Sequence, residues 1–503
     1  MAVKDKVAKR RRTNSNSEGE GGDRGEDRLS TLSDDILIEI ISYLPLRLAI
    51  VTGSLSRRWR GLWTNRTSID INNRTLGVSP YKFSFYIVFR NITKQIRSPS
   101  IQSFFLELDM YTPYWETTLN SWLHQICCSN VQQLKLTWPD FYSHPKPILP
   151  CNFFQVRSLV SVELDQMFGW VFPENGDQIN LPNLKKLSLK FHGSQHKCIE
   201  KLIKMSPLLE DLSLKLEDKG TSCNIIMNYS HQNLRRLSLK LDINYKTEVV
   251  INAPKLDYFD VCGRYDTVFC FEEEPVALSE AKIQLDDDMP YVEGKRSMIQ
   301  FYEAISNVET LTLDVLVLHY ISTVFSNATR LKLNMRTCYK IEILSSLLDM
   351  CPALDVLTIK FGDVSKHFRW NLNPPKHDYV RPVPRVLKRI EIEYFLGEDY
   401  YKPVQSFLEL VEYLLFSSSI ASEHFNFSLT GDKYREMECV DCEKRLELDL
   451  CKVFNKLPLI WIEGEIEFVG EYFKMSRRAG PKVRGASRKV INFSCSSGDN
   501  FKF

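Results

Sequence analysis

One pattern of apolar positions recurs along the chain from about residue 100 onward. It consists of an apolar residue, two other residues, a second apolar residue, one other residue and a third apolar residue. Three consecutive copies are complete: Leu184, Leu187 and Leu189; Leu209, Leu212 and Leu214; Leu234, Leu237 and Leu239. Looser copies are centred on Leu134, Val162, Phe259, Leu311, Leu331, Leu357 and Ile390. The alternation predicts a short strand with one buried face in each copy.

A return segment connects each predicted strand to the next. After the first complete copy, Cys198, Ile199, Leu202 and Ile203 are spaced for one face of a helix, and Pro207 ends it. The middle leucines of the complete copies are 25 residues apart, a period typical of leucine-rich repeats. Such repeats bury their apolar faces only by stacking on one another. Residues 100–370 are therefore predicted to form an irregular solenoid.

A different pattern precedes the repeats, at residues 29–63. Ser33 is a suitable N-cap, the following Asp34 and Asp35 favour the start of a helix, and Pro45 ends that helix. The apolar residues between them cover most of the helix circumference rather than one stripe. A second stripe lies beside arginines and consists of Leu55, Trp59, Leu62 and Trp63. About forty residues cannot bury both faces, so the surplus predicts a partner protein.

These residues resemble an F-box. The matching elements are Leu29-Ser30, Asp34-Asp35-Ile36-Leu37, Leu44-Pro45, and Leu55-Ser56-Arg57-Arg58-Trp59-Arg60 followed by Leu62-Trp63. Ser33 and Leu48 depart from the family pattern, which usually has proline and often a polar residue at these positions. The resemblance implies that the segment docks on the Skp-type adaptor of a cullin–RING ubiquitin ligase. The candidate adaptor contacts are Leu37, Ile41, Leu44, Pro45, Leu55 and Trp59, some of which must instead pack the small bundle; the sequence does not distinguish the two groups.

The C-terminal third has a different organisation. A proline-rich stretch at residues 371–385 precedes a predicted strand at 386–392, an amphipathic helix at 407–416 and a strand at 425–429. This order resembles the FBD region of plant F-box/leucine-rich-repeat proteins and would cap the open end of the solenoid. The fold class is therefore α/β: a three-helix F-box, an irregular leucine-rich-repeat solenoid and an α/β cap. The expected boundaries are 1–27, a disordered polar tail; 28–66, the F-box; 100–370, the repeats; 385–460, the FBD-like cap; and 476–503, a basic flexible tail.

Composition restricts the function and the compartment. Lys and Arg total 65 against 63 Asp and Glu, so bulk charge indicates no nucleic-acid partner. No apolar run reaches the ~18 residues that a membrane-spanning helix needs. The 13 irregularly spaced cysteines suit reduced thiols. We expect the protein in the nucleus, the cytoplasm or both; Lys9-Arg10-Arg11-Arg12 is either a nuclear-import signal or a solvated charge run.

The sequence predicts neither a catalytic site nor a metal or cofactor site. Phosphate-loop, nucleophile-elbow and zinc-helix motifs are absent. Cys439 and Cys442 form one CxxC pair without the two further ligands of a structural zinc site. His192 and His196 are interpreted as histidines of a surface loop because Gly193 and Ser194 separate them.

Residues between the buried leucines would line the concave face of the solenoid. In register, the complete repeats align a lysine column, Lys190, Lys215 and Lys240, beside a serine column, Ser188, Ser213 and Ser238. These columns predict either a site for an acidic or phosphorylated target segment or a solvated row that keeps the sheet soluble.

The resulting interpretation is a non-catalytic substrate receptor. The F-box would bind the Skp-type adaptor, the repeats would hold an unidentified target protein, and other subunits would transfer ubiquitin. The alternative is a leucine-rich-repeat protein that mediates interactions or senses a small ligand without a ligase.

Overall fold

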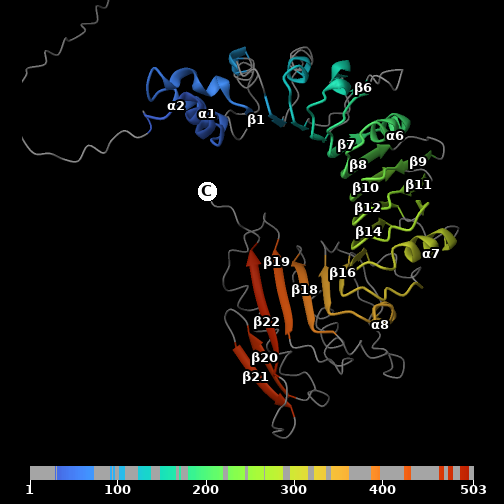
Figure 1. Ribbon diagram of the computed structural model, residues 1–503. Helices are drawn as coiled ribbons and strands as arrows, with labels where there is room; N and C mark the ends of the chain where they lie inside the picture. Colours follow the sequence, from blue (N-terminus) through green and yellow to red (C-terminus); the bar gives the residue numbers. More distant parts are fainter. Residues whose placement is uncertain are drawn as a thin grey trace, which may run out of the picture.

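The computed structural model describes residues 29, 31–72, 91–92, 94–96, 101–107, 123–137, 148–165, 169–170, 179–218, 225–243, 247–264, 267–286, 295–314, 322–335, 341–361, 387–396, 424–431, 464–469, 474–479 and 488–497. The chain forms an arch in which strands line the inner side and helices lie outside (Figure 1). The helices at one end belong to residues 34–65, and the strands at the other end belong to residues 424–497. No described helix is long and apolar enough to cross a membrane.

One 17-stranded sheet runs through the described part of the arch. Its spatial order is β1, β2, β3, β5, β7, β8, β10, β12, β14, β15, β16, β17, β18, β19, β22, β20 and β21. All neighbours pair in parallel except β20 and β21, which are antiparallel. The bounds are β1 Ser68–Asn72, β2 Ser103–Glu107, β3 Gln133–Thr137, β5 Ser161–Leu164, β7 Lys186–Phe191, β8 Asp211–Asp218, β10 Arg236–Ile243, β12 Tyr258–Arg264, β14 Glu280–Asp286, β15 Thr310–Asp314, β16 Arg330–Met335, β17 Val356–Phe361, β18 Arg389–Leu396, β19 His424–Gly431, β20 Gly464–Val469, β21 Lys474–Ala479 and β22 Arg488–Ser497.

The sheet stacks the predicted apolar positions in register. Leu187 pairs with Leu212, Leu212 with Leu237, and Leu237 with Phe259. Each of these side chains is at most 1% exposed. The predicted repeats are therefore confirmed as consecutive parallel strands, and one continuous apolar core connects them.

The parallel sheet also includes strands that the pattern did not predict. β1 begins the sheet at residue 68 rather than near residue 100, and β2, at residues 103–107, precedes the first recognised copy of the pattern, which is centred on Leu134. The apolar positions of the β14 copy are Leu278, Ala281 and Ile283, the last two within the strand. The small alanine side chain obscures the apolar pattern in the sequence. All three side chains are nonetheless buried.

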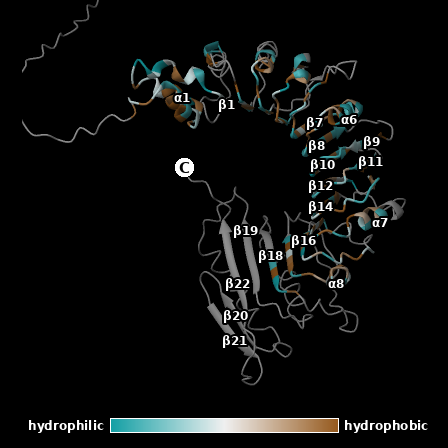
Figure 2. Cartoon of the chain, in the orientation of Figure 1, coloured by the Kyte–Doolittle hydropathy of each residue, from teal (hydrophilic) through white to brown (hydrophobic). Residues whose placement is uncertain are grey.

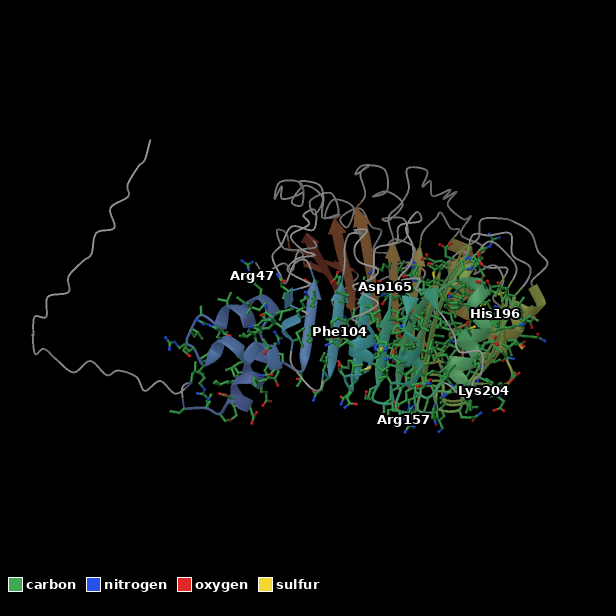
Figure 3. The ribbon with its side chains drawn as sticks, turned by 90° about the horizontal axis from the view of Figure 1, so that it is seen from above. Arg47, Phe104, Arg157, Asp165, His196 and Lys204 are labelled. Carbon is green, nitrogen blue, oxygen red and sulfur yellow. The ribbon has the colours of Figure 1, made fainter. Side chains whose placement is uncertain are left out.

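Shorter elements cover the outer side of the arch. They are helices α6 His196–Lys204, α7 Lys295–Ala304 and α8 Ile341–Asp349; 3-10 helices η2 Cys151–Gln155 and η4 Gly193–Gln195; and strands β4 Ile148–Leu149, β6 Gly169–Trp170, β9 Ile225–Ser230, β11 Thr247–Asn252 and β13 Val268–Phe271. The last three form a second parallel sheet. As predicted, α6 buries Ile199, Leu202 and Ile203. Its two ends, His196 and Lys204, lie on the side of the repeats away from the N-terminal helices of residues 34–65 (Figure 3).

Two contacts attach the outer elements to the solenoid. A Glu200 Oε1 atom on α6 accepts a hydrogen bond from the Asn228 backbone N–H of β9 at 2.7 Å, which occupies one donor of that edge strand. Further along, the rings of Phe259, Phe269 and Phe301 pack with centroids 5.3–6.3 Å apart. This aromatic cluster joins β12, β13 and α7.

The N-terminal bundle consists of α1 Asp34–Ser42, α2 Leu46–Thr52 and the 3-10 helix η1 Trp59–Asn65. Three helices were predicted, and the third is 3-10 rather than α. Both α1 and α2 pack against η1. Arg58 also joins the start of η1 to the start of α1, through an ion pair with Asp34 at 2.7 Å and a bond to the Leu32 carbonyl.

Arg66 connects this bundle to the solenoid. It lies between η1 and β1 and is 4% exposed. One guanidinium nitrogen donates to the carbonyls of Ser42, the last residue of α1, and of Leu44, two residues further on, both at 2.9 Å. Burial lowers the pKa of Arg66, and the Asp70 carboxylate on β1 partly offsets this effect. A single buried cation therefore holds the end of α1 beside the first strand.

The C-terminal strands change part of the expected organisation. Residues 476–503 were expected to be a flexible tail, but β21 and β22 lie in this region, and β22 pairs with both β19 and β20. The alternating Ile491, Phe493 and Cys495 of β22 are in register with Phe425, Phe427 and Leu429 of β19. The high density of basic residues hid this alternation. The predicted strands at 386–392 and 425–429 correspond to β18 and β19, whereas the predicted helix at 407–416 and the CxxC pair lie outside the described residues.

We predict that replacing Arg66 by Met loosens the end of α1. Two carbonyls would lose their donor, which corresponds to about 1–3 kcal/mol of local stability. Hydrogen exchange of the full chain, followed by mass spectrometry, should show faster exchange in residues 40–46. The matched variant Arg60→Met, at an exposed position of η1, should leave that exchange unchanged. Equal protection in both variants would contradict the assigned role.

A second prediction concerns His231, which joins neighbouring repeats. Its Nε2 contacts the Ser206 carbonyl at 3.0 Å, and its Nδ1 accepts from the Asn233 backbone N–H at 3.3 Å. Burial lowers its pKa, although the bond to Ser206 acts in the opposite direction. The folded state therefore favours the neutral ring, and its contribution to stability is complete above the unfolded pKa of about 6.5 and is lost as the pH falls further.

The midpoint of thermal unfolding should accordingly decrease between pH 7.5 and pH 5.5 more in the native protein than in the variant His231→Gln. The exposed His124 provides the control, since His124→Gln should keep the native pH dependence. An identical pH profile for the native protein and His231→Gln would exclude this role.

Candidate protein-interaction surfaces

Half of the predicted adaptor contacts lie inside the N-terminal bundle. Leu37 and Ile41 are fully buried, and Trp59 is 7% exposed. These three side chains pack the α1, α2 and η1 core, because a bundle this small uses one face of each element for its own interior. These three are therefore the candidates that pack the bundle and have no outward face for a partner, and adaptor binding by the other three stays a prediction. Leu44 is half-buried, whereas Pro45 and Leu55 are exposed.

The outward apolar surface consists mainly of other residues. On and just after α1, Ile36, Ile40 and Tyr43 follow one another at helical spacing and are 45%, 39% and 82% exposed. On and just after α2, Leu48, Val51 and Leu55 do the same and are 52%, 56% and 65% exposed. We call these six residues the outer stripes. The turn at residues 43–45 links them.

The concentration of these residues distinguishes them from ordinary surface apolar residues. Among the described residues, seven of the eleven exposed large apolar side chains lie between Leu29 and Leu55. The other four, Leu208, Ile226, Val276 and Val324, are scattered along the solenoid. Figure 2 shows apolar residues gathered on the helices of the bundle. Exposed apolar residues concentrated in this way are typical of a protein-binding surface.

The sequence could not show which stripe faces outward. Apolar residues cover most of the α1 circumference, so periodicity gives two equivalent stripes, Leu37 with Ile41 and Ile36 with Ile40. The packing of η1 against α1 buries the stripe of Leu37 and Ile41 and leaves the other stripe exposed. Leu48, noted in the sequence as a departure from the family pattern, is an exposed member of the outer stripes.

On the inner side of the arch, the predicted columns are in register. Lys190 pairs with Lys215 and Lys215 with Lys240; Ser188 pairs with Ser213 and Ser213 with Ser238. The side chains between the buried leucines thus share one face of the sheet, as predicted. Their capacity to bind an acidic target depends on the charges around them.

One carboxylate neutralises most of the lysine column. Glu217 lies 2.9 Å from the ammonium groups of both Lys190 and Lys215. Burial raises the pKa of Glu217, but its bonds to the two lysines outweigh this effect, so the pKa lies below its usual range. Lys190 is in addition only 6% exposed. A free basic column through all three lysines is therefore not present; Lys240 is its exposed member and has no ion pair with the residues that the structure describes.

A second group of inner-face residues surrounds Tyr258 on β12. The Arg236 guanidinium of β10 lies 3.9 Å from the centroid of the Tyr258 ring, and the Lys282 ammonium of β14 lies 4.8 Å from it. Lys282 also donates to the Tyr258 hydroxyl at 2.8 Å, and this bond raises the pKa of Lys282. The pattern for complete repeats, extended to the looser copy at Phe259, would have placed Tyr258 on this face.

His192, Ser194 and Asp218 lie together where β7 leads into α6. The His192 ring is 3.2 Å from the Ser194 hydroxyl and 3.3 Å from the Asp218 carboxylate. Its Nδ1 also accepts from the Ser194 backbone N–H, and Gln195 accepts from the His192 backbone N–H at 3.0 Å. These bonds form a capping box for η4. The cluster therefore initiates the segment before α6, and His196 is the first residue of α6 rather than part of a loop.

Two family models match this chain. The F-box domain matches residues 29–69, which contain α1, α2, η1 and the start of β1. A model described as "FBD-associated F-box protein At5g56370, LRR repeats" matches residues 119–273, from before β3 to β13. The second match covers all three complete repeats, the lysine column, and Arg236 and Tyr258 of the Tyr258 group, but it ends before Lys282.

The chain is also similar to curated proteins of Arabidopsis thaliana. It is 27% identical over 362 residues to F-box/FBD/LRR-repeat protein At5g22660, covering 67% of this chain and 77% of that protein. It is 30% identical over 264 residues to FBD-associated F-box protein At4g10400, covering 52% and 61%. It is 27% identical over 464 residues to F-box/FBD/LRR-repeat protein At2g04230, covering 89% and 97%. Residues 29–69 thus match the F-box domain, residues 119–273 match FBD-associated leucine-rich repeats, and the chain is similar to F-box/FBD/LRR-repeat proteins of Arabidopsis thaliana.

Proposed function

We propose that this protein is a substrate-recognition subunit of an SCF-type cullin–RING ubiquitin ligase, acting in the nucleus, the cytoplasm or both. In this proposal the F-box binds a Skp-type adaptor and the inner face of the repeats captures a target protein. The observation that carries the proposal is the set of outer stripes on an F-box domain whose own core is already complete. Proteins of the F-box/LRR family are typically non-catalytic adaptors.

The size of the apolar surface supports a stable partner. Six large side chains that are 39–82% exposed would be desolvated in a complex. Burial of such a side chain contributes up to about 1.5–3 kcal/mol when it is complete, so a few central residues would dominate the affinity. The core residues Leu37, Ile41 and Trp59 would act indirectly, because they position the helices that display the stripes.

The chemistry of ubiquitin transfer would lie in other subunits. The contribution of this chain would be proximity, since a tethered target lysine reaches an effective concentration of about a millimolar near the donor thioester. The Arg66 connection supports this role, because it couples the F-box to the first strand of the target-binding sheet.

We predict that the double variant Leu48→Asp, Val51→Asp loses adaptor binding while it keeps its fold. Two exposed contacts would be replaced by charges, which should weaken the complex at least 100-fold if both residues are interface anchors. Titration of the full-length chain with a purified plant Skp-type adaptor, by calorimetry or surface plasmon resonance, measures this change. Circular dichroism and thermal unfolding check the fold.

The matched control is Val276→Asp, because Val276 is 81% exposed but lies in the repeats. It should bind the adaptor as the native protein does. Undiminished binding by the double variant would exclude the outer stripes as the docking surface. A native chain that does not bind the adaptor would exclude the ligase assignment.

A further inference from the structure

Four cations on the inner face have no anionic partner among the described residues. Arg236 and Lys240 lie on β10, and Arg330 and Lys332 lie on β16. The ion pairs of this face join other residues, such as Lys186 with Asp211 and Lys282 with Glu280. The four cations therefore form two basic pairs, one on each strand, which we call the β10 pair and the β16 pair.

Both basic pairs face the same side of the sheet. Alternate residues of a strand share a face, and Leu237, Leu239, Leu331 and Leu333 between and beside the cations are buried. The continuous register from β10 through β12, β14 and β15 to β16 keeps this orientation. Four strand steps of about 4.8 Å separate the pairs, or roughly 19 Å along the arch.

Between the two pairs, the charged residues of β12 and β14 have polar partners, whereas Thr312 and Asp314 on the same face of β15 are buried, at 4% and 0% exposed. The Tyr258 hydroxyl and the Ser238 hydroxyl approach the Asp260 carboxylate at 3.4 and 3.5 Å. Glu280 lies 3.3 Å from Lys282. The β16 pair has no acidic residue directly beside it, because Arg330 pairs in register with Thr310 and Val356, and Lys332 with Thr312 and Thr358. Uncompensated positive charge is thus confined to the two ends of this stretch.

The Arg236 side chain is also held in an orientation that suits anion binding. Its guanidinium lies over the Tyr258 ring at 3.9 Å, which holds the planar group while its N–H donors have no acceptor among the described residues. A guanidinium oriented in this way matches a carboxylate, and less side-chain entropy is lost when the bond forms.

We propose that the inner face from β10 to β16 binds an extended acidic segment of a target protein, with carboxylates on the β10 pair and on the β16 pair. An extended chain rises about 3.3 Å per residue, so carboxylates about six residues apart would span the two pairs. Carboxylates fit better than phosphates, because Asp211, Asp260 and Glu280 near the first pair would repel a dianion. The status of this segment as a ligase substrate rests on the proposed function; its binding does not.

The test uses the full-length chain and a fluorescent peptide that contains Glu-Glu, four serines and Glu-Glu. Fluorescence anisotropy should show binding that weakens as ionic strength rises. The double variant Arg236→Glu, Arg330→Glu should weaken this binding about tenfold or more, since several exposed ion pairs are lost and replaced by repulsion. A peptide with glutamine in place of glutamate should bind at least tenfold more weakly.

The matched control is Lys197→Glu, Lys204→Glu, which makes the same change in net charge at exposed positions of α6, outside the arch. It should bind the peptide as the native chain does. Equal weakening in both double variants, equal binding of the glutamine peptide, or no binding of the glutamate peptide at millimolar concentration would overturn the proposal. Binding of a phosphoserine peptide alone would also overturn it.

Two further measurements separate this proposal from the proposed function. The Leu48→Asp, Val51→Asp variant should bind the acidic peptide normally, and the Arg236→Glu, Arg330→Glu variant should bind the adaptor normally. Loss of peptide binding in the first variant would show that the two surfaces are not independent and would contradict the assigned site.

Discussion

The structure depends on in-register stacking of short parallel strands. No single repeat can bury Leu187, Leu212 or Leu237, because a four- to eight-residue strand has no second layer of its own. Each strand covers the apolar edge of the one before it, and the outer helices and the second sheet close the other side. The strands at the two ends of the stack therefore need other elements to cover their apolar edges. The F-box occupies one end beside β1, and the hairpin of β20 and β21 occupies the other.

Stacking in register also controls the chemistry of the inner face. Identical positions of successive repeats come to lie one strand step apart, so like charges would accumulate in columns unless other residues compensate them. Glu217 provides this compensation for Lys190 and Lys215, and Glu280 provides it for Lys282. Within the described part of the chain, Arg236, Lys240, Arg330 and Lys332 lack such a partner, and they could be recognised only once the ion pairs were known.

The sequence predicted the repeating elements of the fold, but it did not predict the features that depend on packing between elements. The F-box was identified by its resemblance to the F-box family, whereas the N-terminal helices, the strand pattern and the apolar helix face at residues 198–203 follow from local apolar spacing, which a single segment reveals. The outward stripe of α1 does not, because Ile36 and Leu37 are equally apolar and only the position of η1 distinguishes them. The pairing of Lys190 with Glu217 was missed for a similar reason, since it crosses from one strand to the next. β22 was overlooked because its arginines and lysines dominated a composition in which alternation was the better signal.

The short connection between the F-box and the solenoid has a geometric consequence. Only Arg66 and Thr67 separate η1 from β1, and the Arg66 side chain bridges back to the end of α1. In the proposed ligase, a bound target could not swing freely about this joint. The target lysine that reaches the ubiquitin donor would then be set by its position on the surface of the target. The modified lysine would thus be selected by distance and orientation rather than by the sequence around it.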